Sequence, residues 1–190
     1  MNKAYYIAAG VAAVYMAFYL RKANASKKSV AIVGDSLSLS SNGWQNILAK
    51  KYGWKVDNFS KVGQTSANAL AKFKALGANN YDTVFIFLGA NDSYGGVNPA
   101  FTLDNIKQII NLAKSKGAKT IVIRGILSEK VSKDPKALVY DDLKYKMWNL
   151  PGIVVPILRT VDPKDVPDGI HFGSATHKQL ADLIDAWSLR

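Results

Sequence analysis

The sequence predicts an α/β fold, a three-layer α/β/α sandwich in which about five parallel strands lie between two layers of helices. Short runs of β-branched and aromatic residues alternate along the chain with longer segments whose apolar residues recur at helical spacing. The strand runs are apolar almost throughout, which is typical of parallel strands buried on both faces. With 190 residues, 48% of them hydrophobic, the chain is long enough for one domain with its own core.

Several short apolar segments bounded by turn residues have the composition of strands. In chain order they are residues 30–34, 54–60, 82–89, 119–125 and 152–157. The third segment, DTVFIFLG, has the strongest pattern, because its β-branched and aromatic residues follow one another without interruption. These segments supply the strands of the predicted sheet.

The segments between the strands, and the last segment of the chain, carry apolar residues on one helical face. The expected helices are residues 43–53, 66–77, 102–117, 135–150 and 174–187. Gly77 is expected to follow the second helix as a C-cap, and Ser174 to begin the last helix as its N-cap. His177 is expected near the exposed start of that helix. The apolar face of the last helix is expected to carry Leu180, Leu183, Ile184 and Trp187.

The N-terminal segment has a different character from the rest of the chain. Residues 4–20 form an uncharged run between Lys3 and the pair Arg21-Lys22. This run is at the short end of what a helix needs to cross a bilayer, and its tyrosines lie towards both ends, as interfacial aromatic residues do. We expect a single N-terminal transmembrane helix. The chain then divides into an anchor in residues 1–22, a polar linker in residues 23–28 and one domain in residues 29–190.

A cleaved signal peptide is the alternative for the same segment. Ala23-Asn24-Ala25 has the A-x-A form of a cleavage site, and cleavage near Ala25 would give a secreted domain. The length of the apolar run and the basic pair directly after it favour a retained anchor. More basic residues follow the run than precede it, so the positive-inside rule would leave the domain on the cytoplasmic side of a cell's plasma membrane, but the sequence decides neither which membrane it is, cellular or viral, nor which side the domain faces.

Charge and composition exclude several classes of function. The formal charge is +11, and residues 1–28 contain five basic residues and no acid. The lysines of the domain are scattered along the chain, whereas nucleic-acid-binding proteins gather them on one element, so no nucleic acid is expected as a partner. The chain has no cysteine, which excludes a disulfide framework, a thiolate metal site and a cysteine nucleophile.

Polar residues follow the predicted strands at their carboxyl ends, where parallel α/β sheets bind ligands. Residues 34–36 (Gly-Asp-Ser) follow the first strand, Gly63 lies in the turn after the second, and residues 91–92 (Asn-Asp) follow the third. Asp168 and His171 lie in the loop before the last helix. One edge of the sheet therefore collects the parts of an acyl-transfer site.

A serine hydroxyl becomes a strong nucleophile only when a base takes its proton. Ser36 is the candidate nucleophile, and His171 is the candidate base, with Asp168 three residues before it to orient the imidazole. An acyl-transfer site also needs hydrogen-bond donors for the oxyanion. The candidate donors are the backbone N–H groups of Ser36 and Gly63 and the side-chain amide of Asn91.

Four blocks of the sequence resemble the SGNH, or GDSL, hydrolase family. They are GDSLS at residues 34–38, NFSKVGQTS at 58–66, GAND at 89–92 and DGIH at 168–171. The blocks occur in the order found in the family and extend over nearly the whole predicted domain. Four ordered blocks are a far more specific signal than GDSL alone. The resemblance implies an SGNH or flavodoxin-like arrangement of the sheet.

The resemblance also implies an activity and the residues for it. A member of this family would be a serine ester hydrolase that transfers an acyl group to water through an acyl-enzyme, without a metal or a cofactor. Ser36 would be the nucleophile, His171 the base and Asp168 its partner. Ser36, Gly63 and Asn91 would form the oxyanion hole.

Two further aspartates and the substrate complete these expectations. Asp35 is expected to shape the turn after the first strand, because a triad acid must orient the imidazole, and Asp92 is likewise expected to be structural. The loops between the blocks are short, so an open, shallow site is expected. Such a site suits a small acyl group on a larger carrier, such as an acetyl ester on an envelope glycan. A lipid ester at the membrane, contacted through residues 4–20, is the alternative.

Two other classes of protein compete with the hydrolase. The first is a non-catalytic binding or structural protein of an envelope or virion on the same scaffold, which the joint presence of Ser36, Asn91 and His171 disfavours. The second is a nucleotide-binding protein, which the sequence disfavours because no G-x-G-x-x-G follows the first strand. The sequence indicates no oligomeric state.

Overall fold

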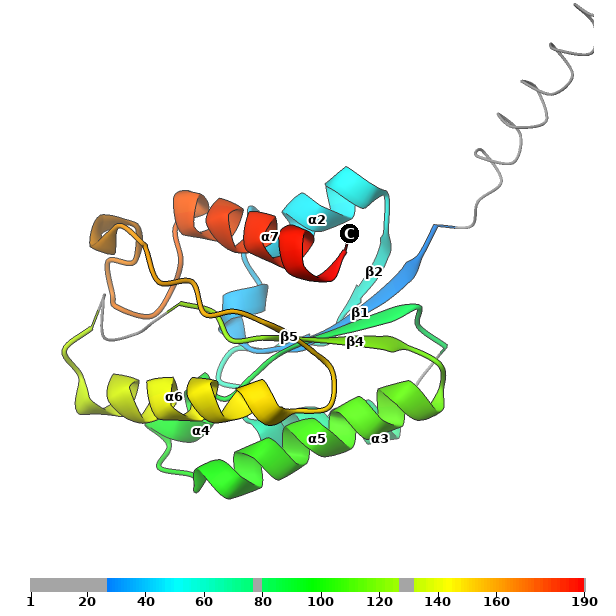
Figure 1. Cartoon of the computed structure of the whole chain (residues 1–190), viewed down its shortest axis with the longest axis horizontal. Coiled ribbons are helices and arrows are strands. Elements are labelled where there is room, and N and C mark those ends of the chain that lie inside the picture. Colours follow the sequence, from blue (N-terminus) through cyan, green and yellow to red (C-terminus); the bar gives the residue numbers. More distant parts are fainter. Residues whose placement is uncertain (1–26, 77–79, 127–131, 190) are drawn as a thin grey trace, which may run out of the picture.

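The computed structural model describes residues 27–76, 80–126 and 132–189, which form a parallel sheet with helices on both faces (Figure 1). The sheet has five strands in the order β2-β1-β3-β4-β5, and every neighbouring pair is parallel. The strands are β1 (Ser29–Gly34), β2 (Lys55–Asn58), β3 (Thr83–Phe87), β4 (Lys119–Ile123) and β5 (Ile153–Val155). The predicted parallel sandwich is confirmed.

Helices form the outer layers of the sandwich. In chain order they are α2 (Trp44–Tyr52), α3 (Ser66–Ala75), α4 (Ala90–Tyr94), α5 (Pro99–Ser115), α6 (Pro135–Lys146) and α7 (Ser174–Ser188). Helices α2 and α7 lie on one face of the sheet, and α3, α4, α5 and α6 lie on the other (Figure 1). Helix α5 begins at Pro99 with Asn98 as its N-cap, three residues before the predicted start, because proline is well suited to a first helical turn.

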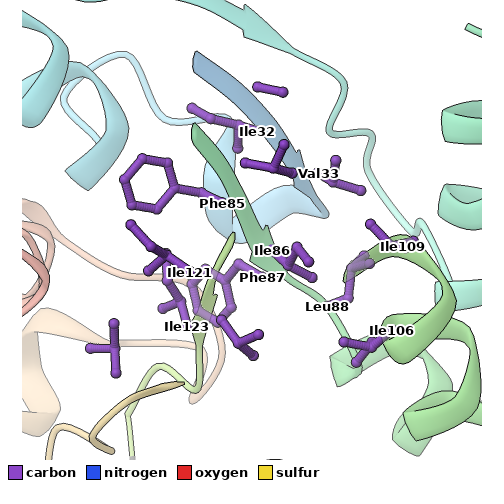
Figure 2. Packing of buried hydrophobic residues seen from close by; sticks show 14 of the residues in the cluster. Ile32, Val33, Phe85, Ile86, Phe87, Leu88, Ile106, Ile109, Ile121 and Ile123 are labelled. Atoms are coloured by element: carbon purple, nitrogen blue, oxygen red, sulfur yellow. The ribbon is translucent and has the colours of Figure 1, made fainter. Parts of the chain in front are cut away.

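The core lies on both faces of the central strand β3, all of whose residues are buried. Figure 2 shows Phe85 beside Ile32 and Ile121 of the neighbouring strands, while Leu88 lies toward Ile106 and Ile109 of α5 on the other face of the sheet. The ring of Trp44 in α2 meets Phe85 edge-on at a centroid distance of 5.5 Å. Burial of one such aromatic side chain stabilises the fold by about 1.5–3 kcal/mol. The core therefore holds the carboxyl ends of the strands, and the turns attached to them, in fixed positions.

The strand order places a switch point between β1 and β3. The chain leaves β1 to form β2 on one side, and later returns to form β3 on the other side of β1. In sheets of this kind the connections diverge at the carboxyl ends of the two strands and leave a crevice there. Ser36 follows β1 and Asn91 follows β3, so both of these predicted site residues lie at the switch point.

Two details of the helices differ from the sequence predictions. Helix α4 was not predicted, because five residues are too few to show a helical period. The N-cap of α7 is Gly173 and not Ser174. The carboxylate of Asp165 accepts a hydrogen bond from the Thr176 N–H group and so satisfies the start of this helix from outside it. The predicted C-cap Gly77 lies outside the described residues.

His177 and Trp187 of α7 also differ from expectation. His177 is buried and not exposed, because α2 packs over it and the Trp44 N–H group donates to its Nδ1 atom at 3.3 Å. Trp187 is 55% exposed instead of buried, whereas Leu180 and Ile184 on the same predicted face are in the core. Trp187 follows the helical period but lies at the edge of the sheet.

The N-terminal expectations concern a part of the chain that the structure does not describe. The predicted anchor in residues 1–22 lies outside the described residues, as does most of the predicted linker in residues 23–28. Strand β1 begins at Ser29, where the domain was expected to start. None of the helices in the described ranges is long and apolar enough to cross a bilayer.

Candidate active site

Ser36 lies at the start of a 3-10 turn directly after β1. The Oδ1 atom of Asp35 accepts a hydrogen bond from the Leu37 N–H group at 3.0 Å and caps this turn. Gly34 is required by close packing, since a Cβ atom there would lie 2.7 Å from Ser38 Oγ and 2.9 Å from Ser60 Oγ. The residues GDS therefore end the strand and present the serine side chain at the edge of the sheet. Asp35 shapes the turn, as predicted.

His171 and Asp168 lie in the loop before α7 and are locked together by hydrogen bonds. The Oδ1 atom of Asp168 accepts from the N–H groups of Ile170 at 2.9 Å and His171 at 2.7 Å, which fixes the turn. Its Oδ2 atom lies 2.6 Å from His171 Nδ1. The other ring nitrogen, Nε2, lies 3.0 Å from Ser36 Oγ. The structure thus brings together three side chains that the sequence places up to 135 residues apart.

The Asp168 carboxylate is electrostatically suited to orient the imidazole. Desolvation raises its pKa, but the hydrogen bonds from His171 and Ile170 outweigh desolvation and lower the pKa to about 2. The carboxylate is therefore ionised at neutral pH, and it fixes the His171 tautomer with the proton on Nδ1. That tautomer leaves Nε2 free to accept a proton from the serine hydroxyl.

The predicted oxyanion donors lie at the same edge of the sheet. Gly63 adopts a left-handed conformation, with φ of +69°, in the turn after β2. Asn91 lies in the first turn of α4, and its Nδ2 atom donates to Asp35 Oδ2 at 3.3 Å and to Gln64 O at 3.2 Å. The amide of Asn91 is therefore held directly beside the residue that precedes Ser36.

Burial gives Asp35 an unusual proton affinity. Desolvation raises its pKa to about 7, although the hydrogen bond from Leu37 and the charge of His171 oppose the shift. Asp92 is also buried, and its carboxylate accepts hydrogen bonds from the backbone and hydroxyl of Ser66. Asp92 thereby joins the start of α3 to α4, which is the structural role predicted for it.

Gln64 contributes to the site although the sequence did not single it out. Its side-chain Nε2 atom donates to Gly34 O at 2.7 Å, and its main-chain carbonyl oxygen accepts from the Asn91 side chain. The side chain is buried, so it ties the turn after β2 to the end of β1. The sequence could have indicated Gln64, because it directly follows Gly63 within the block NFSKVGQTS that resembles the hydrolase family. Across the residues that can be described, no three His, Asp or Glu side chains gather as a metal site would require.

A small hollow is lined by residues that neighbour Ser36 and His171 in the sequence. Its volume is about 20 Å³. Its wall includes residues adjacent in sequence to the site groups, namely Leu37, Ala90 and Ile170. Tyr140 and Lys144 of α6 also line it, and both are buried. We call this space, between Leu37, Ala90, Ile170, Tyr140 and Lys144, the site hollow.

A parallel α/β/α sandwich with a serine, a histidine and an aspartate hydrogen-bonded at its strand ends has the architecture of an SGNH-type carboxylic ester hydrolase. Comparison with known families agrees with this class. Residues 30–188 match the GDSL-like Lipase/Acylhydrolase family, and the chain belongs to that family. The resemblance of the four sequence blocks is therefore confirmed at the level of the family.

Two relatives are named as esterases. Esterase TesA of Pseudomonas aeruginosa is 34% identical over 119 residues, which are 57% of this chain and 59% of that protein. An arylesterase of Vibrio mimicus is 29% identical over 135 residues, which are 65% of this chain and 68% of that protein. The chain thus spans less than two thirds of the length of the first relative.

Solved structures show the same fold. A crystal structure of TesA matches with a TM-score of 0.67 at 28% sequence identity, covering 83% of this chain and 96% of that chain. Axe2, an acetylxylan esterase from Geobacillus stearothermophilus, matches with a TM-score of 0.69 at 17% identity, covering 84% and 93%. The sandwich of this protein is therefore that of the family over most of the chain.

Proposed function

We propose that this protein hydrolyses esters of small acyl groups through an acyl-enzyme formed on Ser36. One observation carries the proposal, namely the continuous hydrogen-bonded chain from Ser36 Oγ through the His171 ring to the Asp168 carboxylate. It lies at the switch point of a parallel sheet, where ligands of such folds bind. Membership of an acylhydrolase family supports the same activity.

The proposed mechanism follows from the roles of these atoms. His171 Nε2 takes the proton of Ser36 as Oγ attacks the ester carbonyl, and the resulting imidazolium is stabilised by Asp168. The oxyanion is stabilised by the N–H groups of Ser36 and Gly63 and by the amide of Asn91, which exchanges its long 3.3 Å hydrogen bond to Asp35 for one to the oxyanion. His171 then gives its proton to the leaving alcohol. In the second half of the reaction it activates a water molecule, which releases the acid and restores the serine.

The site hollow supports a small acyl group. The site hollow, with a volume of about 20 Å³, holds one group about the size of a water molecule, because a single water needs roughly 10–15 Å³. The methyl group of an acetyl ester would fill this space, and the buried ring of Tyr140 is one of the groups in its wall that a longer alkyl chain would have to displace. We therefore favour an acetyl ester on a larger carrier, such as an envelope glycan, over a lipid ester.

Acyl-chain length tests this preference directly. Wild-type protein is expected to hydrolyse p-nitrophenyl acetate with a kcat/KM at least about tenfold above that for p-nitrophenyl octanoate, because the additional methylenes have no space. Tyr140→Leu replaces the ring in the wall of the site hollow with a smaller side chain, so it is expected to lower the ratio of kcat/KM for the acetate to kcat/KM for the octanoate. Tyr140→Phe keeps the size of the ring and is the matched control. Equal kcat/KM for the two esters in the wild type would contradict a small acyl pocket.

We also propose that residues 1–22 anchor the enzyme to a membrane by a single helix. The uncharged run at residues 4–20 and its basic flanks support this proposal. The full chain, expressed in a bacterium, is expected to remain with the membrane fraction after extraction at alkaline pH. A soluble chain whose mass shows that it begins near Ser26 would instead support the cleaved signal peptide and would contradict the anchor.

A further inference from the structure

A second and larger hollow lies at the edge of the sheet beyond β5. Its volume is about 520 Å³, which is within the range of small-molecule sites. It lies between the end of α6 and the end of α7, which flank β5 on opposite faces of the sheet (Figure 1). The residues that define it, which we call the β5 groove, are Arg124, Tyr145, Trp148, Ile157, Arg159 and Trp187.

Aromatic side chains form the walls of the β5 groove. Trp148 is 53% exposed, Trp187 is 55% exposed and Tyr145 is 49% exposed. Large aromatic rings gathered at one exposed hollow are costly to leave in water, and Trp, Tyr and Arg are the residues that dominate binding sites. Trp187 departs from the buried face predicted for α7 by pointing towards this groove, where it lines the wall.

Arg124 places a buried positive charge at the groove. Its side chain follows β4, and the residue is only 6% exposed. Nε donates to Val155 O at 2.9 Å, and the guanidinium carbon lies 4.7 Å from the centroid of the Trp148 ring. Among the described residues only Val155 O accepts a hydrogen bond from Arg124, so its terminal nitrogens are open to solvent or to a ligand.

The charges around the groove favour an anionic ligand. Burial lowers the pKa of Arg124, and the nearby positive charge of Arg159 lowers it further. Within residues 27–76, 80–126 and 132–189, neither arginine forms an ion pair with a carboxylate. A carboxylate brought by a ligand would supply the missing partner, because guanidinium groups bind carboxylates through paired hydrogen bonds.

Arg124 also connects the β5 groove with the proposed active site. It lines both the groove and the site hollow, whose lining also includes Leu37, next to Ser36 in the sequence. A ligand seated in the groove therefore lies beside the ester-binding position. The groove is on the side of the site away from the turn of Gly63 and β2, because β5 and β2 are the two edges of the sheet.

We propose that the β5 groove binds the carrier part of the substrate, and that this carrier is a carboxylated saccharide. The apolar C–H face of a sugar ring stacks on Trp148 or Trp187, while its carboxylate pairs with Arg124 and Arg159. A lipid tail offers no group for the two arginines, and a neutral sugar leaves them unpaired. This inference rests on the proposed ester hydrolysis, of which it names the substrate class.

Binding of unacylated oligosaccharides tests the groove separately from catalysis. The full chain in detergent is titrated calorimetrically with tetramers of galacturonate, mannuronate and hyaluronan repeats, and with neutral cellotetraose and maltotetraose. We expect at least one acidic tetramer to bind at least about tenfold more tightly than both neutral ones, as the loss of one charged contact predicts. Tryptophan fluorescence is expected to change on binding, because two of the four tryptophans line the groove.

Substitutions test whether the acidic tetramer binds in the β5 groove. Arg159→Ala changes an exposed side chain and is expected to fold with an unchanged thermal midpoint. Trp148→Ala also removes the ring that packs on Arg124, so it is expected to fold with a modestly lower midpoint. Both variants are expected to weaken binding of the acidic tetramer at least about tenfold. Phe101→Ala removes another exposed aromatic ring, on α5 and outside the groove, and is the matched control with unchanged affinity. Arg159→Lys keeps the positive charge but loses the planar guanidinium with its paired donors. Its affinity for the acidic tetramer is expected to lie between those of Arg159→Ala and the wild type.

Three outcomes would overturn the inference. The first is no binding of any acidic tetramer, and the second is binding that Trp148→Ala and Arg159→Ala leave unchanged. The third is a dimer in solution that Trp148→Ala converts to a monomer, which would make the groove an interface between two copies. In each case, hydrolysis of p-nitrophenyl acetate by the wild type would leave the proposed activity standing. Its absence would count against that activity instead.

Discussion

Ser36→Ala is expected to abolish ester hydrolysis, with a fall in kcat of about 10⁶-fold or to the background of the assay. No acyl-enzyme can form without Oγ, and the neighbouring donors can only stabilise a slow direct attack by water. The change removes one half-buried hydroxyl whose partner is the exposed His171, so the thermal midpoint is expected to shift little. The measurement is hydrolysis of p-nitrophenyl acetate beside thermal unfolding of the same preparations.

Ser38→Ala is the matched control for this experiment. Ser38 lies in the same 3-10 turn, but its Oγ atom is buried and has no hydrogen-bond partner in the structure. Its removal is expected to leave turnover within a fewfold of the wild type. Equal turnover in the wild type and Ser36→Ala would show that Ser36 is not the nucleophile. It would favour a non-catalytic protein on the same scaffold.

Asp168→Asn is expected to lower kcat about 10⁴-fold with little change in KM. An asparagine retains the turn, since its side-chain oxygen can still accept from the Ile170 and His171 N–H groups. It cannot stabilise the imidazolium, and its amide favours the wrong tautomer of His171. Steady-state kinetics on p-nitrophenyl acetate, with kcat and KM measured separately, checks this expectation.

Two variants sharpen the interpretation of Asp168→Asn. Asp162→Asn changes an aspartate that caps Lys164 in the same loop and is expected to leave kcat unchanged. Asn91→Ala removes a proposed oxyanion donor and is expected to lower kcat by about 10²–10³-fold, less than the loss of the triad acid. A full kcat in Asp168→Asn would exclude this carboxylate from the mechanism. A similar loss in Asp162→Asn would indicate that the loop and not the charge is responsible.

The local features of this protein follow from its sequence. The period of the apolar residues determines the alternation of strands and helices, and β3 is apolar from Val84 to Phe87, as expected of a strand covered on both faces. The contact between Asp168 and His171 could be predicted from the sequence, because residues three apart in a turn are brought together by its backbone hydrogen bonds. The anchor in residues 1–22 stays a prediction from the same kind of pattern.

Only the tertiary structure decided which side chains meet across the chain. The burial of His177 depends on α2, and the cap of α7 comes from Asp165, so neither was visible in the helix itself. The volume of the site hollow depends on where α6 places Tyr140. Arg124 directly follows a strand and has no distinguishing sequence pattern, yet the packing of β5 and Trp148 makes it a buried cation. Periodicity is a local property, whereas burial and pairing depend on contacts between segments that are distant in the sequence.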